Sequence, residues 1–387
     1  YSPTLPMPDP LPTAVAVVHE WLVSRAGSEK VVEQMLAVCP QADVFSLVQF
    51  LEPEAAGLIP PGTSVQTSFI QNLPWARRHF RQYLPLMPLA VEQFDLSAYD
   101  LVLSSNHAVA KGVLTRPHQL HVSYVHTPIR YAWDLQHQYL QQAGLARGAK
   151  SALTRLILHY LRLWDLAAAH RVDCFVANSR YVARRVWKTY RRPATVIYPP
   201  VAVDRFRWQQ PRDDFYLTVS RCVPYKRVDL TVAAFNRLGL PLVVIGDGPA
   251  LAAIQRMAQP NIRFLRNPPD EVVSDHMERC RGFIFPAEED FGITVVEAQA
   301  AGAPVIALGQ GGCAETVIDG KTGVLFGRQT VEHLVEAVTY FEQRRGEFVA
   351  EIIRNQAEAF SEQRFRRALT QYLAEKWLKF RQGDELE

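Results

Sequence analysis

Two glutamates with seven residues between them mark the part of this chain whose residue types could do chemistry. Glu289 and Glu297 bracket a turn at Gly292, which lies between an apolar run and a predicted helix. A strand, a glycine turn and a helix N-terminus together form an anion site. Carboxylates on either side can hold the hydroxyls of a sugar or ribose through charge-assisted hydrogen bonds. The pattern therefore predicts a site for a nucleotide-sugar.

The same two glutamates also have a structural interpretation. Thr294-x-x-Glu297 fits a helix capping box, in which the Glu297 side chain bonds back to the backbone. A carboxylate at a strand end, such as Glu289, is usually solvated. This short stretch alone does not separate binding from capping, so the surrounding sequence has to decide.

Five landmarks follow one another in an order typical of one enzyme family. They are Tyr124-Val-His126-Thr-Pro-Ile-Arg130, Ser220-Arg221-Cys-Val-Pro-Tyr-Lys226, Gly246-Asp-Gly-Pro249, the Glu289–Glu297 stretch, and Gly311-Gly312-Cys-Ala-Glu315 followed by Asp319-Gly-Lys-Thr-Gly-Val-Leu325. Over residues 14–375 the chain resembles the family 4 retaining glycosyltransferases, whose Glu-x7-Glu motif it reproduces. Through the first landmark and Tyr198-Pro-Pro-Val201 it is most similar to bacterial O-antigen and exopolysaccharide enzymes, in which mannosyltransferases are prominent.

The resemblance implies a GT-B fold: α/β, with two doubly wound Rossmann-like domains facing across a cleft. It also implies that a hexose moves, with retention, from a nucleotide diphosphate sugar to a glycan or polyprenyl-linked acceptor. We expect GDP-mannose as the donor, ahead of a UDP-hexose.

Glycosyl transfer gathers negative charge on the departing diphosphate, so cations aimed at it supply the main stabilisation. Arg221 and Lys226 follow the apolar run Phe215–Val219 and are the candidates for this role. One such contact at about 4 Å is worth roughly 4 kcal/mol at an effective dielectric of about 20, before desolvation costs. Taken alone, the pair also fits two solvated cations at a helix start. We expect no cofactor and no metal, because these cations and the helix neutralise the diphosphate and no Asp-x-Asp triad suggests one.

The resemblance also gives roles to the glutamates and their turn. Glu289 would bind hydroxyls of the donor sugar, and Glu297 would bind the ribose. Backbone amides around Gly292 and Ile293 would receive the sugar or phosphate, aided by the positive end of a helix that starts near Thr294.

Further site residues are assigned by the same resemblance. His126 follows the strand 122–125 and would contact the donor sugar near the reacting carbon, although a lone histidine at a strand end is more often structural. Arg130 and Tyr131 are candidates on the acceptor side. Arg266 begins the loop that we expect to recognise the nucleotide base.

The first loop departs from the family pattern. Many relatives carry a Gly-Gly pair there, which lets the backbone approach the phosphates. Here Ala26 precedes Gly27, so only Gly27 matches, and a helix should begin near Ser28. We interpret Gly246-Asp-Gly-Pro249 as a structural turn rather than a substrate contact.

Composition narrows the class of protein. The chain of 387 residues is 48% hydrophobic, long enough for two packed domains, and has no apolar run near the length of a membrane span. Its five cysteines include no C-x-x-C pair, which favours a reducing, cytoplasmic compartment over a disulfide frame or zinc site. Residues 1–13 form a proline-rich leader without the pattern of a signal peptide.

Charge is unevenly divided along the chain. Residues 1–210 carry 21 Lys+Arg against 14 Asp+Glu, and the remainder carries 21 against 25, so +7 and −4 give the net +3. The basic first half predicts an anionic partner, such as the inner face of a membrane or a phosphorylated carrier. The excess is too small to predict nucleic-acid binding. The basic, aromatic and apolar segment 75–89 fits either membrane contact or ordinary helix packing.

Alternating strands and helices predict parallel sheets in two domains. The expected strands are 14–18, 99–104, 122–125, 174–177 and 195–198, then 215–219, 242–245, 262–265, 283–285 and 305–308. These give an acceptor-binding domain at 14–205 and a donor domain at 206–365. A final amphipathic helix, 366–387, either returns to the first domain or packs on the second.

Other functions stay open at this point. A nucleotide-sugar 2-epimerase on the same fold would turn over the donor without an acceptor, and a catalytically idle nucleotide-binding scaffold would make no product. A dinucleotide oxidoreductase is disfavoured, because no Gly-x-Gly-x-x-Gly follows the first strand.

Overall fold

A computed structural model describes residues 11–145 and 147–386, which fold as two compact units. Unit 1 runs to Tyr198 and resumes at Phe365, whereas unit 2 is Pro199–Arg364. The segment 199–205, assigned to the first domain from the sequence, lies with unit 2, where the Val201 amide donates to Phe360 O over 3.0 Å. Of the predicted leader, residues 1–10 lie outside the described part of the chain.

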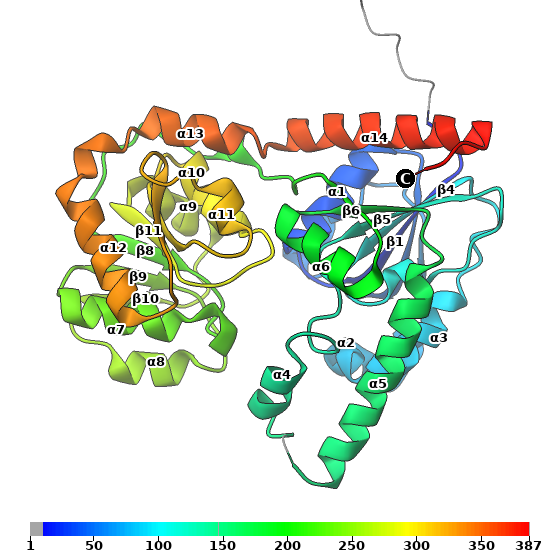
Figure 1. The fold of residues 1–387 in the computed structure, drawn as a ribbon, viewed down its shortest axis with the longest axis horizontal. Helices are drawn as coiled ribbons and strands as arrows, with labels where there is room; N and C mark the ends of the chain where they lie inside the picture. The colour runs from blue at the N-terminus through cyan, green and yellow to red at the C-terminus, as the bar shows by residue number, and fades with distance from the viewer. Residues whose placement is uncertain (1–10, 146, 387) are drawn as a thin grey trace, which may run out of the picture. The chain divides into compact units, whose positions relative to one another are not determined.

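Unit 1 is built on a seven-stranded parallel sheet of order β3-β2-β1-β4-β5-β6-β7 (Figure 1). The strands are β1 (Val15–Leu22), β2 (Asp43–Gln49), β3 (Val65–Thr67), β4 (Leu101–Asn106), β5 (Leu120–Val125), β6 (Cys174–Ala177) and β7 (Thr195–Val196). The helices are α1 (Gly27–Val38), α2 (Ala76–His79), α3 (Met87–Glu92), α4 (Gln136–Gln142), α5 (Ala149–Ala169), α6 (Arg180–Tyr190) and α14 (Glu362–Gln382). Short 3-10 turns are η1 (Pro53–Leu58), η2 (Phe69–Asn72), η3 (Phe80–Leu86) and η4 (Ala110–Gly112). The central strands are buried throughout, as expected for a parallel sheet with helices on both faces.

Unit 2 is built on a six-stranded parallel sheet of order β10-β9-β8-β11-β12-β13. The strands are β8 (Tyr216–Val219), β9 (Leu242–Ile245), β10 (Ile262–Leu265), β11 (Gly282–Phe285), β12 (Val305–Leu308) and β13 (Gly323–Phe326). The helices are α7 (Val228–Leu238), α8 (Leu251–Met257), α9 (Asp270–Arg279), α10 (Ile293–Ala300), α11 (Cys313–Thr316), α12 (Val331–Gln343) and α13 (Ala350–Glu358). Short 3-10 turns are η5 (Val203–Arg205), η6 (Pro224–Lys226) and η7 (Arg345–Glu347). The prediction of two doubly wound α/β domains is therefore confirmed.

The strand order decides which side chains meet. All strands of each sheet are parallel, so their carboxyl ends lie along one edge. In unit 1, β4 lies between β1 and β5, and His19 pairs in register with Ser105. In unit 2, β11 lies between β8 and β12. Residues that follow these central strands are therefore neighbours in space.

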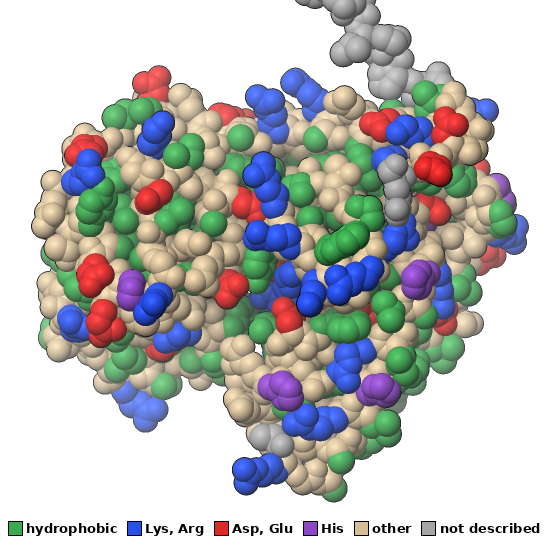
Figure 2. Space-filling model, viewed as in Figure 1, with side chains coloured by type: hydrophobic (Ala, Val, Ile, Leu, Met, Phe, Trp, Pro, Cys, Tyr) green, Lys and Arg blue, Asp and Glu red, His purple; other side chains and the backbone are tan. Residues whose placement is uncertain are grey.

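Basic side chains are not spread evenly over unit 1. In the view of Figure 2 they gather over α6, whose sequence carries four arginines and lysines in its first nine residues: Arg180, Arg184, Arg185 and Lys188. The basic excess of the first half of the chain is thus partly concentrated on one helix.

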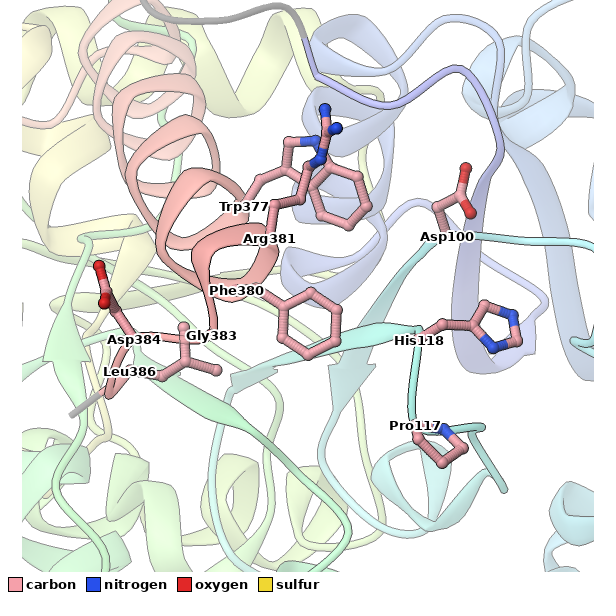
Figure 3. A pocket seen from close by; sticks show the side chains of 9 residues that line it. All are labelled: Asp100, Pro117, His118, Trp377, Phe380, Arg381, Gly383, Asp384 and Leu386. Carbon is pink, nitrogen blue, oxygen red and sulfur yellow. The ribbon is translucent and has the colours of Figure 1, made fainter.

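The last helix, α14, packs on unit 1. Phe365, Leu369 and Leu373 are buried in the same apolar cluster as Val17 and Tyr124. Beyond this contact, the end of α14 borders an open hollow of about 820 Å³ (Figure 3). Its lining residues include Asp100, Pro117 and His118, which precede β4 and β5, so the hollow lies at the amino-terminal edge of the sheet.

Candidate functional site

Lys226 and Glu289 meet at the carboxyl edge of the unit 2 sheet. Lys226 follows β8 and Glu289 follows β11, and these two strands are paired. The Lys226 Nζ lies 2.6 Å from Glu289 Oε1, and each side chain is 18% exposed. Nζ also lies 5.9 Å from the centroid of the Phe285 ring. A cation and a carboxylate therefore stand side by side at a partly open edge, where a ligand can reach both.

The glycine pair after β12 holds the backbone of Glu289 in place. Gly311 forms a bridge with Glu289, and the Gly312 amide donates to Glu289 O over 2.8 Å. A Cβ at Gly311 would lie 2.4 Å from Glu289 O, and one at Gly312 would lie 2.3 Å from Phe291 Cα. Only glycine permits this approach, which accounts for the pair in the sequence.

The helix α10 begins directly beside this pair. Its N-cap is Gly292 in the left-handed region, at φ 83°, and no side chain caps the helix. The capping box that Thr294 and Glu297 could have formed is therefore absent. Within the described residues, the amides of Ile293 and Thr294 have no hydrogen-bond acceptor. These amides and the helix dipole make the turn suitable for an anion.

Glu297 lies on α10 and is buried. Its Oε1 lies 3.9 Å from Arg205 Nη2, and the Arg205 guanidinium stacks over Phe206 at 4.6 Å. The Glu297 carboxylate does not cap α10, so it is available for another role. Its binding of the ribose stays a prediction.

Arg221 lies in the exposed turn after β8 and pairs with no carboxylate in the described part of the chain. The Gly246-Asp-Gly-Pro249 turn supports this segment, because the Cys222 amide donates to Asp247 O over 2.8 Å. A Cβ at Gly246 would lie 1.9 Å from Ser220 O, so a glycine is required there. The turn contributes structurally by holding Arg221 at the sheet edge.

The loop that carries Arg266 is fixed through Asp247. The Arg266 Nε lies 3.0 Å from Asp247 Oδ2, and Asn267 Nδ2 donates to the same oxygen over 3.0 Å. These contacts join the loops after β9 and β10, at the same edge as Lys226.

His126 stands at the carboxyl edge of unit 1, directly after β5. Its Nε2 lies 2.8 Å from Ser105 Oγ, and its carbonyl accepts from Asn178 Nδ2 over 3.0 Å. Burial, together with the charges of His107 and His19, lowers the pKa of His126 to about 3. The imidazole is therefore neutral near neutral pH, and it can exchange hydrogen bonds with a ligand without adding a charge.

Beside His126 lies a buried acidic group that sequence analysis missed. Glu20 Oε1 accepts hydrogen bonds from four consecutive amides, those of residues 107–110, at 2.8–3.1 Å. Its Oε2 lies 3.0 Å from His107 Nδ1. Although burial opposes ionisation, the charge and hydrogen bond of His107, with those of His19 and the Ala108 amide, lower the pKa of Glu20. The signal in the sequence was an acid that follows a histidine inside a strand whose other residues are apolar.

The remaining predicted residues of unit 1 follow the carboxyl ends of β1 and β5. Gly27 is the first residue of α1, whose N-cap, Ala26, makes no side-chain bond. Arg130 and Tyr131 follow the His126 segment, and Tyr131 packs against Tyr139 at a ring distance of 5.9 Å. Burial raises the pKa of Tyr131, so its hydroxyl stays protonated.

Comparison with solved structures supports the GT-B class of fold. The crystal structure of Anabaena HepE in complex with UDP and glucose superposes with a TM-score of 0.69 at 15% identity, covering 93% of this chain and 99% of that chain. Sucrose-phosphate synthase from Thermosynechococcus elongatus gives a TM-score of 0.69 at 15% identity, covering 92% and 98%. At this identity the likeness concerns the fold.

Family models identify the family. The model described as Glycosyltransferase Family 4 matches residues 27–205, and the model described as Glycosyl transferases group 1 matches residues 202–359. Together they extend over most of both units. The chain therefore belongs to the family 4 glycosyltransferases.

Curated relatives resemble part of the chain. It is 30% identical over 198 residues to the GDP-mannose-dependent alpha-(1-6)-phosphatidylinositol monomannoside mannosyltransferase of Mycolicibacterium smegmatis, covering 43% of this chain and 52% of that protein. It is 33% identical over 153 residues to the O-antigen chain mannosyltransferase C of Escherichia coli, covering 35% and 41%. The chain thus spans about half the length, or less, of these relatives.

Proposed function

We propose that this protein is a retaining hexosyltransferase that transfers a hexose from a nucleotide diphosphate sugar to a glycan or lipid-linked acceptor in polysaccharide assembly. The observation that carries the proposal is the 2.6 Å pair of Lys226 and Glu289 beside the acceptor-free amides of α10. Cation, carboxylate and helix N-terminus together match a diphosphate attached to a polyhydroxyl ring.

In the proposed reaction the bond between C1 of the sugar and the diphosphate oxygen breaks, and its electrons pass to the diphosphate. A new bond forms from C1 to an acceptor hydroxyl, whose proton passes to the departing phosphate. Arg221, Lys226 and the α10 amides stabilise the developing negative charge, and no metal ion is required for that role. Glu289 holds sugar hydroxyls, and the neutral His126 binds the sugar near C1.

We propose GDP-mannose as the donor. The two relatives described above are named as mannosyltransferases, and one of those names specifies GDP-mannose. A UDP-hexose is the next candidate. The loop of Arg266, fixed by Asp247, is the proposed contact for the base.

For the acceptor we propose a glycan or a polyprenyl-diphosphate-linked sugar, bound by unit 1 near Arg130 and Tyr131. The surplus of basic residues in the first half of the chain favours such an anionic carrier. In the described part of the chain, no helix is both long and apolar enough to cross a membrane. The proposed place of work is the cytoplasm, at the inner face of the membrane.

Calorimetric titration with GDP, UDP and their sugars tests the donor site. We expect GDP and GDP-mannose to bind the wild type and to bind Glu297→Ala more weakly, with Lys321→Ala as a matched control at an exposed lysine of the same unit. Absence of binding by either nucleotide would overturn the donor site and favour a scaffold role. Product analysis completes the test, because donor turnover without any acceptor would instead indicate a 2-epimerase.

A further inference from the structure

The helix α5 carries a second apolar stripe that faces outward. Leu158 and Leu161 are buried and fix the helix to unit 1. On the opposite side, Leu153, Leu156 and Leu163 are 60%, 64% and 58% exposed. Tyr160 and Leu166 continue the same stripe, at 46% and 38% exposed. The steps of three and four residues keep these side chains on one face, which extends about 20 Å along the helix.

The charges of α5 outside its one buried ion pair are all positive. Its cations are Lys150, Arg155 and Arg162, and none of them pairs with a carboxylate among the described residues. The only acid of the helix, Asp165, is buried and paired with Lys111. Figure 2 shows basic and histidine side chains on the surface over α4 and α5. Arg162 donates to Ala132 O and Gln136 Oε1, so the cations available beside the outward leucines are Lys150 and Arg155. A face with leucines and cations that lack carboxylate partners is complementary to an apolar, anionic partner.

We propose that the outward stripe of α5 docks unit 1 onto an anionic lipid bilayer. The leucines would enter the boundary between headgroups and acyl chains, while Lys150 and Arg155 would meet lipid phosphates. A second copy of the chain fits less well, because a two-fold interface must be self-complementary and the exposed charges of this helix include no acid. Figure 1 shows α5 extending well beyond the strands of unit 1, so its amino-terminal half is not screened by the sheet.

The test is sedimentation of the full chain with phosphatidylcholine vesicles prepared with and without phosphatidylglycerol. We expect binding to the anionic vesicles, and about a hundredfold weaker binding of a triple variant with Leu153→Ser, Leu156→Ser and Leu163→Ser. The matched control is Val349→Ser with Ile352→Ser, which removes exposed apolar side chains from unit 2 and should bind as the wild type does.

Charge is tested separately by Lys150→Gln with Arg155→Gln, which should weaken binding to the anionic vesicles about tenfold. Circular dichroism and the thermal transition show whether each variant is folded. Equal binding to both kinds of vesicle, or binding unchanged by the triple variant, would overturn the proposal. A dimer in vesicle-free buffer that the triple variant dissociates would also overturn it, in favour of a second copy. The vesicle assay contains no nucleotide, so a failure to bind vesicles would not contradict the proposed transfer reaction.

Discussion

Backbone amides at the carboxyl edges of the two sheets differ in whether the chain supplies their acceptor. In unit 1, four backbone amides converge on Glu20, a carboxylate supplied by the chain itself. In unit 2, the amides of Ile293 and Thr294 converge on no acceptor in the described structure, and Glu289 is paired with Lys226 instead. The first edge is neutralised from within, and the second is left ready for an anion from outside.

The difference shows what each edge can bind. The Glu20 carboxylate already occupies the amides after β4, so an incoming phosphate would meet a negative charge there. Gly292, by contrast, has no side chain that could fill the turn before α10. This comparison supports our proposal that unit 2 binds the donor diphosphate, while unit 1 offers neutral groups such as His126. Four predictions can break or sharpen this comparison, and they follow in order of decreasing effect.

The largest effect should come from emptying the internal carboxylate site. Glu20→Ala leaves four amides and the partly buried His107 without their partner, so we expect the free energy of unfolding of unit 1 to fall by about 3–5 kcal/mol. Urea denaturation, monitored by tryptophan fluorescence, measures this change in the free energy of unfolding. Glu20→Gln keeps one acceptor oxygen, so its free energy of unfolding should fall by less. If Glu20→Ala is as stable as the wild type, the carboxylate is not the structural anion of this edge.

Removing a cation from the open edge should affect catalysis rather than folding. Lys226→Ala should lower kcat about 100- to 1000-fold, because it removes a donor aimed at the leaving diphosphate. The thermal transition should change little, since the Lys226–Glu289 pair is partly exposed. Lys321→Ala should leave kcat unchanged. A Lys226→Ala variant that retains full turnover would contradict the role of the cation.

A smaller loss is expected at Glu297. Its replacement by Ala should weaken GDP binding about tenfold, through loss of a charged hydrogen bond to the ribose. A deoxyribose analogue of GDP should lose less affinity on the same substitution, because it presents fewer hydroxyls to the carboxylate. Calorimetry checks both values. Equal weakening for ribose and deoxyribose nucleotides would show that Glu297 acts only on the packing of α10.

The smallest effect concerns pH. Burial disfavours the charged form of His19, but the carboxylates of Glu29 and Glu20, each 3.8 Å from a ring nitrogen, raise its pKa above 6.5. A raised folded-state pKa means that His19 stabilises the fold fully below pH 6.5, and that this contribution is lost as pH rises through the folded value. His19→Asn should therefore flatten the decline in unfolding free energy above pH 6.5. A decline of equal slope in the variant would assign it to other groups.

Much of the fold was predictable because short apolar runs alternate with helical patterns. The strands 174–177, 242–245, 262–265 and 305–308 were predicted with the bounds that the structure has. The strand β2 was not predicted, because Asp43, Ser46 and Gln49 interrupt its apolar pattern, although Ser46 is buried and donates to Val48 O over 3.0 Å. The strands β3 and β13 were missed as well, and both are short and lie at sheet edges.

The candidate site, like the fold, could be predicted from the sequence only in part. The proximity of Lys226 and Glu289 follows from two motifs once β8 and β11 are neighbours, and that neighbourhood is a property of sheet order. The role of Glu20 could not be predicted, because its partners lie 87 to 90 residues further along the chain. Backbone amides carry no sequence signal of their own. The motifs therefore predicted the Lys226–Glu289 site of unit 2, whereas the Glu20 site of unit 1 could be recognised only from the fold.

The packing of α14 has a consequence for how the chain is made. Phe365, Leu369 and Leu373 complete an apolar cluster that begins at Val15. A ribosome therefore finishes all of unit 2 before it reaches the residues that close unit 1. We therefore expect the common order, in which the amino-terminal domain folds first, to be reversed here. Unit 2 can fold while an apolar face of unit 1 is still exposed to solvent. In the nascent chain, burial of that face depends on the synthesis of α14.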